Sequence, residues 1–168
     1  LQFVKSGGYE NSKFWSEPGW EWRKFRNVKW PTFWKQDGPA GSNRFRLRTT
    51  FEDISMQWDW PVIVNYYEAK AYCRWLSDQE DEVSHFRLLQ ESEHLAIRDS
   101  RLALEEASVF RGDTVHPLNK ILTPSEQSSA NHNLRFGSES PVDAMTANDR
   151  GFHDTFGNVW QWCEDTFH

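Results

Sequence analysis

Residues 151–162, with the sequence GFHDTFGNVWQW, are the stretch that decides the fold. Gly157 and Asn158 form a pair that turns easily through positive φ values. Residues 159–162 then alternate apolar and polar side chains, a pattern typical of a strand. Because Trp160 and Trp162 have the same strand parity, we expect both to face the core, with Trp160 as a buried anchor. The stretch therefore predicts a tight polar loop held between aromatic anchors.

The composition describes a globular chain that is rich in aromatic residues. Its 168 residues fit one domain with a sizeable core, and they include ten Trp and twelve Phe. Aromatic side chains bury large areas, so they suit a core with little regular structure. The net charge of −6 argues against nucleic acid or an anionic membrane as the main partner. The sequence also shows neither an apolar run of membrane-spanning length nor a signal peptide.

The cysteines indicate where in the cell the protein is located, and the first residue indicates whether the chain is a fragment. Cys73 and Cys163 are far apart, which favours two free thiols over a disulfide and so a cytoplasmic location. A disulfide between them is the alternative. The chain begins at Leu1 rather than Met, and it stops just after the GFHDTFGNVWQW stretch. We therefore predict that the chain is a fragment of a longer protein.

Local signals predict helices and one strand in the first half of the chain. Ser16 as N-cap and Pro18 in the first turn predict a helix to about Phe25. The aromatic residues of segment 1–35 are interpreted as core, with a ring-stacking or carbohydrate-binding surface as the alternative. Residues 36–43 form a turn-rich loop, and the alternation of residues 45–51 predicts a strand.

Asn65 and Glu68 occupy the positions of a capping box, which predicts a helix from there to about residue 76. We expect one buried stripe on this helix, and Cys73 within it as an inert core thiol rather than a nucleophile. The members of that stripe are Ala69, Tyr72, Cys73 and Leu76. Residues 86–89 are interpreted as a short strand or bend. Residues 90–98 predict a second helix with acidic residues in its first turn, continued by a helical extension near residues 101–109.

Four blocks of sequence, in the same order, resemble the formylglycine-generating-enzyme superfamily. The blocks are residues 61–75 (PVIVNYYEAKAYCRW), 86–94 (FRLLQESEH), 140–143 (SPVD) and the GFHDTFGNVWQW stretch. The resemblance implies an α+β fold, a variant of the C-type-lectin fold, with two main helices, short twisted strands and much irregular structure. Leu89 and Gln90 replace the Pro-Thr pair of the family block.

The N-terminal third of the chain resembles one group of enzymes within that superfamily more specifically. Residues 7–11, 14–23 and 31–34 (GGYEN, FWSEPGWEWR and PTFW) are similar to the sulfoxide synthases of thiol-histidine biosynthesis. The resemblance is greatest to the 5-histidylcysteine sulfoxide synthases of the ovothiol pathway, and the ergothioneine-pathway synthases are relatives. It implies that a DinB-like domain with an iron(II) site precedes residues 1–168. It also implies small-molecule substrates, namely cysteine, histidine and dioxygen.

The chain departs from the family in residues that carry the chemistry. The His-x-x-x-His-x-Glu motif for iron does not occur, and the six His show no such spacing. In the family, the residues that hold substrate, the active-site Tyr and the copper-binding cysteines lie beyond the Gly-Asn-Val-Trp block. We therefore assign no catalytic or cofactor-binding residue within this chain, and we expect the chain alone to bind no iron and to be inactive.

The resemblance also implies a structural calcium site in the signature stretch. The positions that match its ligands are Asp154, Gly157, Val159 and Gln161, where Gln161 replaces a carboxylate by a neutral amide. The alternative is a hydrogen-bonded loop in which Asp154 caps backbone N–H groups. A second calcium loop would start at Asn133 and Leu134, but its other ligands are absent. We interpret His153 as a core residue and His132 as a loop hydrogen-bonder rather than as catalytic residues.

Three functions fit the sequence. The favoured one is the lectin-like domain of a non-haem iron sulfoxide synthase, in which this domain forms a wall of the active site. The second is a non-catalytic binding or scaffold module with the same fold. The third is a protein-modifying oxidase of the formylglycine-generating type. An upstream His-x-x-x-His-x-Glu motif in the gene would favour the first.

Overall fold

The computed structural model describes residues 1–79, 85–98, 131 and 136–165. The chain divides into two compact units. Unit 1 contains residues 1–56, 62–90 and the segment from residue 162 onward, and unit 2 contains residues 57–61 and 91–161. The described residues form a mixed α+β structure with four α-helices, one 3₁₀ helix and three strands. None of the helices within these ranges is both long and apolar enough to cross a membrane.

Unit 1 begins with three helices, of which the sequence predicted only the third. After α1 (Gln2–Lys5) and η1 (Ser12–Phe14) comes α2 (Glu17–Arg26), whose N-cap Ser16 accepts a hydrogen bond from the backbone N–H of Gly19. Helix α2 ends at Asn27, which has φ 49° and serves as a left-handed C-cap. The expected N-cap is therefore confirmed.

Helix α3 (Tyr66–Gln79) begins with the expected capping box. The side chain of Asn65 accepts a 2.9 Å bond from the N–H of Glu68, and the Glu68 carboxylate accepts a 2.9 Å bond from the N–H of Asn65. The expected buried stripe is wrong: Glu68, Ala71 and Trp75 are buried, whereas Tyr72 is 47% exposed and Cys73 is only partly buried. The N-terminal aromatic residues pack on the face that carries Ala71 and Trp75, which shifts the buried stripe by one position.

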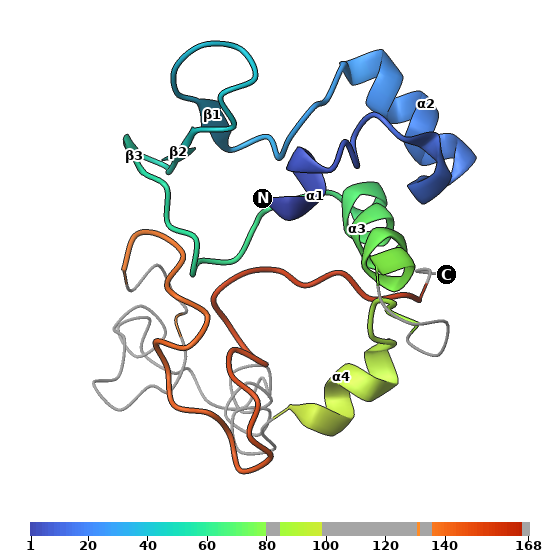
Figure 1. Ribbon diagram of the computed structural model, residues 1–168. Coiled ribbons are helices and arrows are strands. Elements are labelled where there is room, and N and C mark those ends of the chain that lie inside the picture. Colours follow the sequence, from blue (N-terminus) through green and yellow to red (C-terminus); the bar gives the residue numbers. More distant parts are fainter. Residues whose placement is uncertain (80–84, 99–130, 132–135, 166–168) are drawn as a thin grey trace, which may run out of the picture. The chain divides into compact units, whose positions relative to one another are not determined.

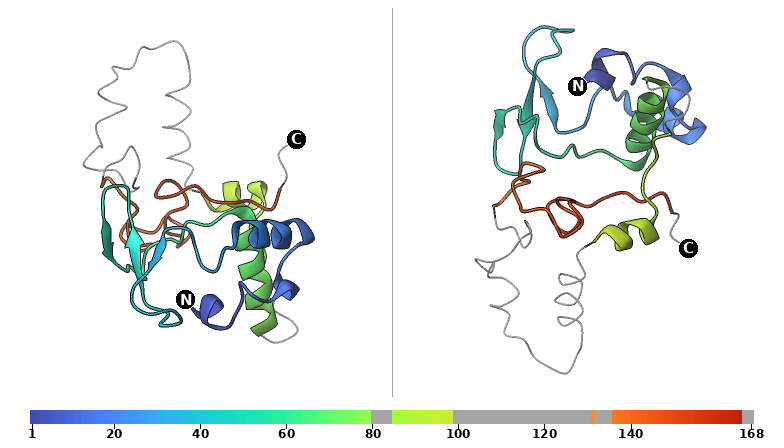
Figure 2. Two further views of the ribbon diagram at one scale, coloured as in Figure 1. Left: turned by 90° about the horizontal axis from the view of Figure 1, so that it is seen from above. Right: turned by 60° about the horizontal axis from the view of Figure 1, so that its bottom comes forward.

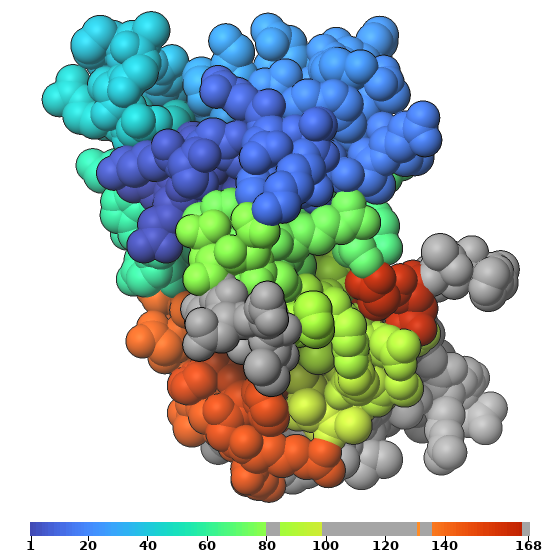
Figure 3. All heavy atoms as spheres, turned by 45° about the vertical axis from the view of Figure 1, so that its right-hand side comes forward, coloured from blue at the N-terminus to red at the C-terminus, as the bar shows by residue number. Residues whose placement is uncertain are grey.

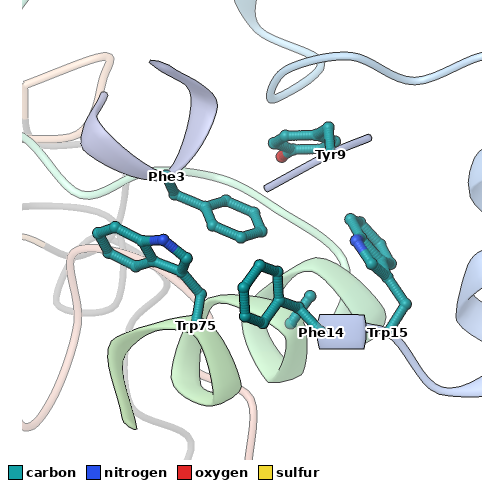
Figure 4. Packing of buried hydrophobic residues seen from close by; sticks show 6 residues of the cluster. Phe3, Tyr9, Phe14, Trp15 and Trp75 are labelled. Atoms are coloured by element: carbon teal, nitrogen blue, oxygen red, sulfur yellow. The ribbon is translucent and has the colours of Figure 1, made fainter. Parts of the chain in front are cut away.

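The core of unit 1 is a cluster of aromatic rings over α3 (Figure 4). The Phe3 ring lies among Tyr9, Phe14 and Trp75, with ring centroids 5.3, 6.3 and 5.6 Å away, respectively. Gly8 allows this approach, because a Cβ there would lie 2.0 Å from the Phe3 ring. The N-terminal segments cover α3 closely (Figure 3). The sequence thus located the core correctly in the N-terminal aromatic set, although Phe25 on α2 is 86% exposed.

A small antiparallel sheet completes unit 1 (Figures 1 and 2). Its strands are β1 (Trp34–Gln36), β2 (Phe45–Arg48) and β3 (Asp53–Ser55), in the order β1-β2-β3. Trp34 pairs with Leu47, and Arg48 pairs with Asp53. The predicted strand 45–51 is confirmed for its first four residues. It ends at Arg48 because Thr49 and Glu52 close a turn through hydrogen bonds of 2.9 and 3.3 Å.

Unit 2 contains α4 (Glu91–Ile97) and a long irregular segment. Glu91 and Glu93 lie in the first turn of α4, where the helix dipole favours acidic residues. Residues 136–161 form turns and bends with no helix or strand (Figure 1). In unit 1, residues 86–89, which were predicted as a short strand or bend, have no regular structure. The predicted helical extension at 101–109 lies outside the described residues.

Candidate functional site

The backbone of the signature stretch is set by four residues with positive φ. These are Gly151 (82°), Asp154 (48°), Gly157 (87°) and Asn158 (61°). Gly, Asn and Asp are the residues that enter this region most readily. Four such residues so close together prevent an extended strand, so residues 151–159 form a compact series of bends.

Asn158 is the centre of the hydrogen bonds that hold this loop. Its Nδ2 donates to the Ser140 carbonyl at 3.0 Å and to Oδ2 of Asp154 at 2.8 Å. Its Oδ1 accepts from the N–H of Ser140 at 2.9 Å and from Nδ2 of Asn131 at 3.3 Å. Its own N–H donates to the Asn131 carbonyl at 2.6 Å. Asn131 and Ser140 are both buried, so one side chain joins three chain segments in a site with little water.

Asn148 organises the beginning of the loop. Its Oδ1 accepts from the N–H groups of Arg150 and Phe152 at 2.9 and 3.1 Å, respectively, and its Nδ2 donates to the Ile97 carbonyl at 2.7 Å. The Arg98 guanidinium lies 4.6 Å from the centroid of the Phe156 ring. These contacts fix the loop against α4, which therefore serves as its support within unit 2.

Asp154 carries one of the buried polar atoms without a hydrogen-bond partner among the described residues. Its Oδ1 is buried and has no hydrogen-bond partner among the described residues, although Oδ2 is bonded to Asn158. A buried, unpaired carboxylate oxygen is costly and fits a hard cation such as calcium. Among the ligands that the resemblance implies, Asp154 thus has a buried oxygen that fits a cation.

The other expected calcium ligands are partly engaged in closing the loop. Nε2 of Gln161 donates to the Asp154 carbonyl at 2.7 Å, which leaves its Oε1 for a cation. The Gly157 carbonyl accepts from the N–H of Val159 at 2.9 Å and keeps a second lone pair. Within the described ranges, the Asp154 carboxylate bonds the side chain of Asn158 rather than backbone N–H groups. Asn133 and Leu134, the first residues of the expected second calcium loop, lie outside the described residues.

The expected role of Trp160 is wrong. Its side chain is 101% exposed, and residues 160–163 form no strand. The bends that precede it and the Gln161 bond to Asp154 hold the loop without a partner strand, so strand parity does not apply. Trp162, in unit 1, is 51% exposed, and its Nε1 donates to the Val64 carbonyl at 2.9 Å.

His153 is exposed rather than packed in a core, so this expectation is also wrong. Its Nδ1 lies 2.8 Å from the Met145 carbonyl, which gives the ring a role in holding the loop. A ring nitrogen bonded to a backbone carbonyl carries its proton there, so this contact favours one tautomer of the imidazole. His132 lies outside the described residues.

In unit 1, the segment from residue 162 onward is linked to α3 by an ion pair. The Lys70 ammonium pairs with the Glu164 carboxylate, and the N–H of Glu164 donates to the Leu89 carbonyl at 2.8 Å. Burial raises the pKa of the nearby Cys73 thiol, which disfavours the thiolate. Cys73 and Cys163 form no disulfide with each other. The expectation that Cys73 is unreactive thus has a physical cause, although it lies outside the buried stripe.

Within the described ranges, no three or more His, Cys, Asp or Glu side chains lie close enough together to hold a metal ion. The ligands of an iron centre are imidazole and carboxylate groups that converge on one point. The described residues therefore do not fit iron. Calcium differs, because it accepts backbone carbonyls and amide oxygens around a single carboxylate.

A family model described as "Sulfatase-modifying factor enzyme 1-like domain" matches residues 1–168. The chain belongs to this family. Family membership agrees with the resemblance in the four sequence blocks, and the loop built around Asn158 is thus the loop of a sulfatase-modifying factor enzyme 1-like domain.

Curated relatives of this sulfatase-modifying factor enzyme 1-like chain are hercynine oxygenases. The protein from Mycobacterium tuberculosis is 42% identical over 77 residues, and the match covers 44% of this chain and 16% of that protein. The protein from Mycolicibacterium thermoresistibile is 39% identical over 77 residues, which are 44% of this chain and 15% of the relative. The protein from Mycolicibacterium smegmatis is 36% identical over 76 residues, with 44% and 16% covered. The match thus spans only a small part of the length of these relatives.

Sequence reasoning missed two members of the loop in this sulfatase-modifying factor enzyme 1-like domain. Asn131 and Ser140 are buried partners of Asn158, although they precede it by 27 and 18 residues, respectively. A signal was present, because Ser140 precedes Pro141 in a family block and Asn131 begins an Asn-His-Asn sequence. Their polar side chains gave no indication of which distant residue they would bond.

Proposed function

We propose that this chain is the lectin-like domain of a non-haem iron sulfoxide synthase of the ovothiol type, which joins cysteine to histidine with dioxygen. The observation that carries the proposal is the 42% identity with a hercynine oxygenase in a chain of the sulfatase-modifying factor enzyme 1-like family. The N-terminal blocks that resemble 5-histidylcysteine sulfoxide synthases favour histidine as the ring substrate. Cys73 and Cys163 form no disulfide with each other, which favours a cytoplasmic location.

The reaction balances without another reductant. A carbon–sulfur bond forms between the cysteine sulfur and a ring carbon of histidine, and the S–H and ring C–H bonds break. This coupling removes two electrons, and oxidation of sulfur to the sulfoxide removes two more. Dioxygen takes all four electrons: one oxygen atom enters the sulfoxide, and the other leaves as water with the two protons.

The role of this chain in that reaction is to form and support a wall of the active site. We assign residues 1–168 to a single lectin-like domain, and we assign iron(II) to a preceding DinB-like domain, because the described residues do not fit iron. The Asn158 bonds hold the signature loop in one conformation, which suits a rigid wall for small substrates. No step of the reaction is assigned to a residue of this chain.

We also propose that the signature loop binds a structural calcium ion through Asp154, Gly157, Val159 and Gln161. The unpaired Oδ1 of Asp154 supports this, and the ion would supply the charge that this buried oxygen lacks among the described residues. With a single carboxylate the site has a low negative charge, so we expect weaker binding than at sites with several carboxylates.

The enzymatic proposal is tested on the full-length product of the gene that encodes this chain. The protein is loaded with iron(II) under anaerobic conditions and given cysteine, histidine and dioxygen, and products are separated by mass. We expect a histidine–cysteine sulfoxide that requires all three substrates. If a coupled product forms only when trimethylhistidine is supplied, the ring substrate is trimethylhistidine rather than histidine. Absence of coupling with either would overturn the proposal in favour of a non-catalytic module or a protein-modifying oxidase.

A further inference from the structure

The loop that joins β1 to β2 (Figure 1) begins with the sequence Asp37-Gly38. Asp37 directly follows the last residue of β1, and its N–H donates to the Arg44 carbonyl at 2.8 Å. Residues 37–41 are all exposed. No other Asp or Asn in this sequence precedes a Gly. An Asp side chain reacts most readily with the main chain at such a pair, because Gly has no Cβ to shield its nitrogen.

The conformation of the loop requires Gly at position 38. Its φ is +97°, a value that residues with a side chain rarely adopt. A Cβ at this position would also lie 2.5 Å from Nη2 of Arg44. The turn after β1 therefore selects the residue that leaves the main-chain nitrogen after Asp37 least shielded.

The groups that would react with each other are not engaged elsewhere. Within the part of the chain that the structure describes, the Gly38 N–H donates no hydrogen bond, and the Asp37 carboxylate makes neither a hydrogen bond nor an ion pair. The Asp37 carbonyl accepts a 3.2 Å bond from the Ser42 hydroxyl. Among the described residues, this exposed bond is the one that holds the peptide group between Asp37 and Gly38. Rotation of that peptide group brings the Gly38 nitrogen towards the Asp37 carboxyl carbon.

Two other exposed aspartates have the opposite arrangement. Asp143 precedes Ala144 and Asp149 precedes Arg150, and the N–H of each following residue donates a hydrogen bond, of 3.0 and 2.9 Å, respectively. A Cβ also shields each of these nitrogens. The hydrogen bond alone slows attack by the nitrogen by roughly twofold to tenfold, and the Cβ slows it further.

We propose that Asp37 is a modification site, which converts spontaneously to isoaspartate through a cyclic imide with Gly38. The Gly38 nitrogen attacks Cγ of Asp37 and forms an N–C bond. The carboxyl C–O bond breaks, and the hydroxyl leaves with the amide proton as water. Water then adds to the ring, and cleavage of the bond between the nitrogen and the original main-chain carbonyl carbon gives isoaspartate. No electrons are exchanged, and the product has the mass of the parent.

The modification changes the main chain where β1 ends. It adds one methylene group between residues 37 and 38 and leaves a free carboxylate on Cα of Asp37. The bond from the Asp37 N–H to the Arg44 carbonyl lies next to the pair formed by Gln36 and Phe45. The added length falls after this bond, so we expect the loop to change and the strand pairing to remain. The site is independent of the sulfoxide synthase reaction proposed above.

The test compares the full-length gene product with an acetylated synthetic peptide of residues 35–45, both incubated at neutral pH for several weeks. Trypsin releases residues 36–44 (QDGPAGSNR) and 136–150 (FGSESPVDAMTANDR) from the protein, because it cleaves after Lys and Arg. Chromatography against synthetic standards separates the aspartyl and isoaspartyl forms. We expect isoaspartate at Asp37 to form in the protein at a rate within about tenfold of that in the synthetic peptide. It should also exceed isoaspartate in residues 136–150 of the same sample at least about tenfold.

Two variants test the chemistry at Asp37. Asp37→Glu keeps the charge and should give no isomerised peptide, because the longer side chain would have to close a six-membered imide. Asp37→Asn forms the same imide with loss of ammonia and should give isoaspartate faster than the parent, because a neutral amide does not repel the attacking nitrogen as a carboxylate does.

Three results would overturn the proposal. The first is isomerisation more than about tenfold slower in the protein than in the synthetic peptide, because the fold would then protect Asp37. The second is equal isoaspartate in residues 36–44 and 136–150. The third is an Asp37→Asn protein that forms isoaspartate no faster than the parent.

Discussion

The hydroxyl of Tyr9 donates a 2.7 Å hydrogen bond to Oε1 of Glu68, a residue that is only 3% exposed. The other oxygen of Glu68 accepts from the N–H of Asn65 in the capping box. No Lys, Arg or His is paired with this carboxylate among the described residues. Burial therefore raises the pKa of the Glu68 carboxyl, although both hydrogen bonds oppose the shift.

This shift predicts a pH dependence of stability. A carboxyl whose pKa is higher in the folded state binds a proton more tightly there, so its contribution to the free energy of unfolding is greatest below its unfolded pKa. That contribution is lost as the pH rises through the folded pKa. We expect the difference in unfolding free energy between the parent and Glu68→Gln to fall from about pH 4 to pH 7.

The measurement is urea unfolding of both proteins across that range. Taking the difference cancels the contributions of other titratable groups, including half-buried Asp53, whose lowered pKa has the opposite effect on stability. A difference that stays flat or rises with pH would show that Glu68 is not held as the structure indicates.

The Asn158 bonds predict a large loss of stability on truncation. Asn158→Ala leaves the N–H of Ser140, the amide of Asn131 and Oδ2 of Asp154 without this partner. We expect a cost of about 2–4 kcal/mol in the free energy of unfolding. Urea unfolding, followed by a probe in unit 2, measures it.

Asn43→Ala is the matched control. Asn43 also has a positive φ, 51°, but its side chain makes one 3.3 Å bond to the Gly41 carbonyl. The control therefore measures the backbone cost, for which we expect about 1 kcal/mol. Equal losses for the two variants would mean that the Asn158 side chain adds nothing beyond its backbone conformation.

The structure separates what local sequence patterns determine from what they do not. The caps at Ser16 and at Asn65 and Glu68 were predicted correctly because their partners lie three residues away. The strand at β2 was predicted in position but was too long, because the Thr49 turn ends it. The buried stripe of α3 was misplaced, since it depends on which face the distant Phe3 and Phe14 rings cover.

The candidate site shows the same division. Gly157 and Asn158 indicated the turn, and the family resemblance indicated the Asp154 carboxylate. The contacts of Asn158 with Asn131 and Ser140 span 27 and 18 residues, and no periodicity in the sequence reports such pairs. The exposure of Trp160 was missed because its alternation with Gln161 was interpreted as a strand without a known partner strand.

Calcium is expected to stabilise the signature loop. A calcium concentration 100 times the dissociation constant should raise the free energy of unfolding by about 2.7 kcal/mol. Asp154→Asn should remove this effect, because it neutralises the one carboxylate of the proposed site. Thermal unfolding with calcium, magnesium or a chelator measures the shift.

Asp143→Asn serves as the control for calcium, since Asp143 is exposed and outside the proposed ligand set. This variant should keep the full response. A calcium shift that persists in Asp154→Asn, or that is absent from the parent protein, would contradict a calcium site at Asp154.

Truncation of Trp160 and of Trp75 should change the free energy of unfolding by very different amounts. Trp160→Ala removes a fully exposed side chain and should change the free energy of unfolding by less than about 0.5 kcal/mol. Trp75→Ala removes a side chain that is 6% exposed and should cost about 3–5 kcal/mol. Urea unfolding of the two variants compares them. A loss at Trp160 as large as that at Trp75 would contradict the exposed position.

The proposed sulfoxide synthase reaction is tested most directly by the fate of labelled dioxygen. The full-length, iron-loaded gene product is supplied with cysteine, histidine and ¹⁸O₂, and the mass of the coupled product is measured. We predict a sulfoxide that carries one labelled oxygen atom and one product formed for each dioxygen consumed. A coupled product without the label, or dioxygen consumption without a carbon–sulfur bond to histidine, would contradict this reaction.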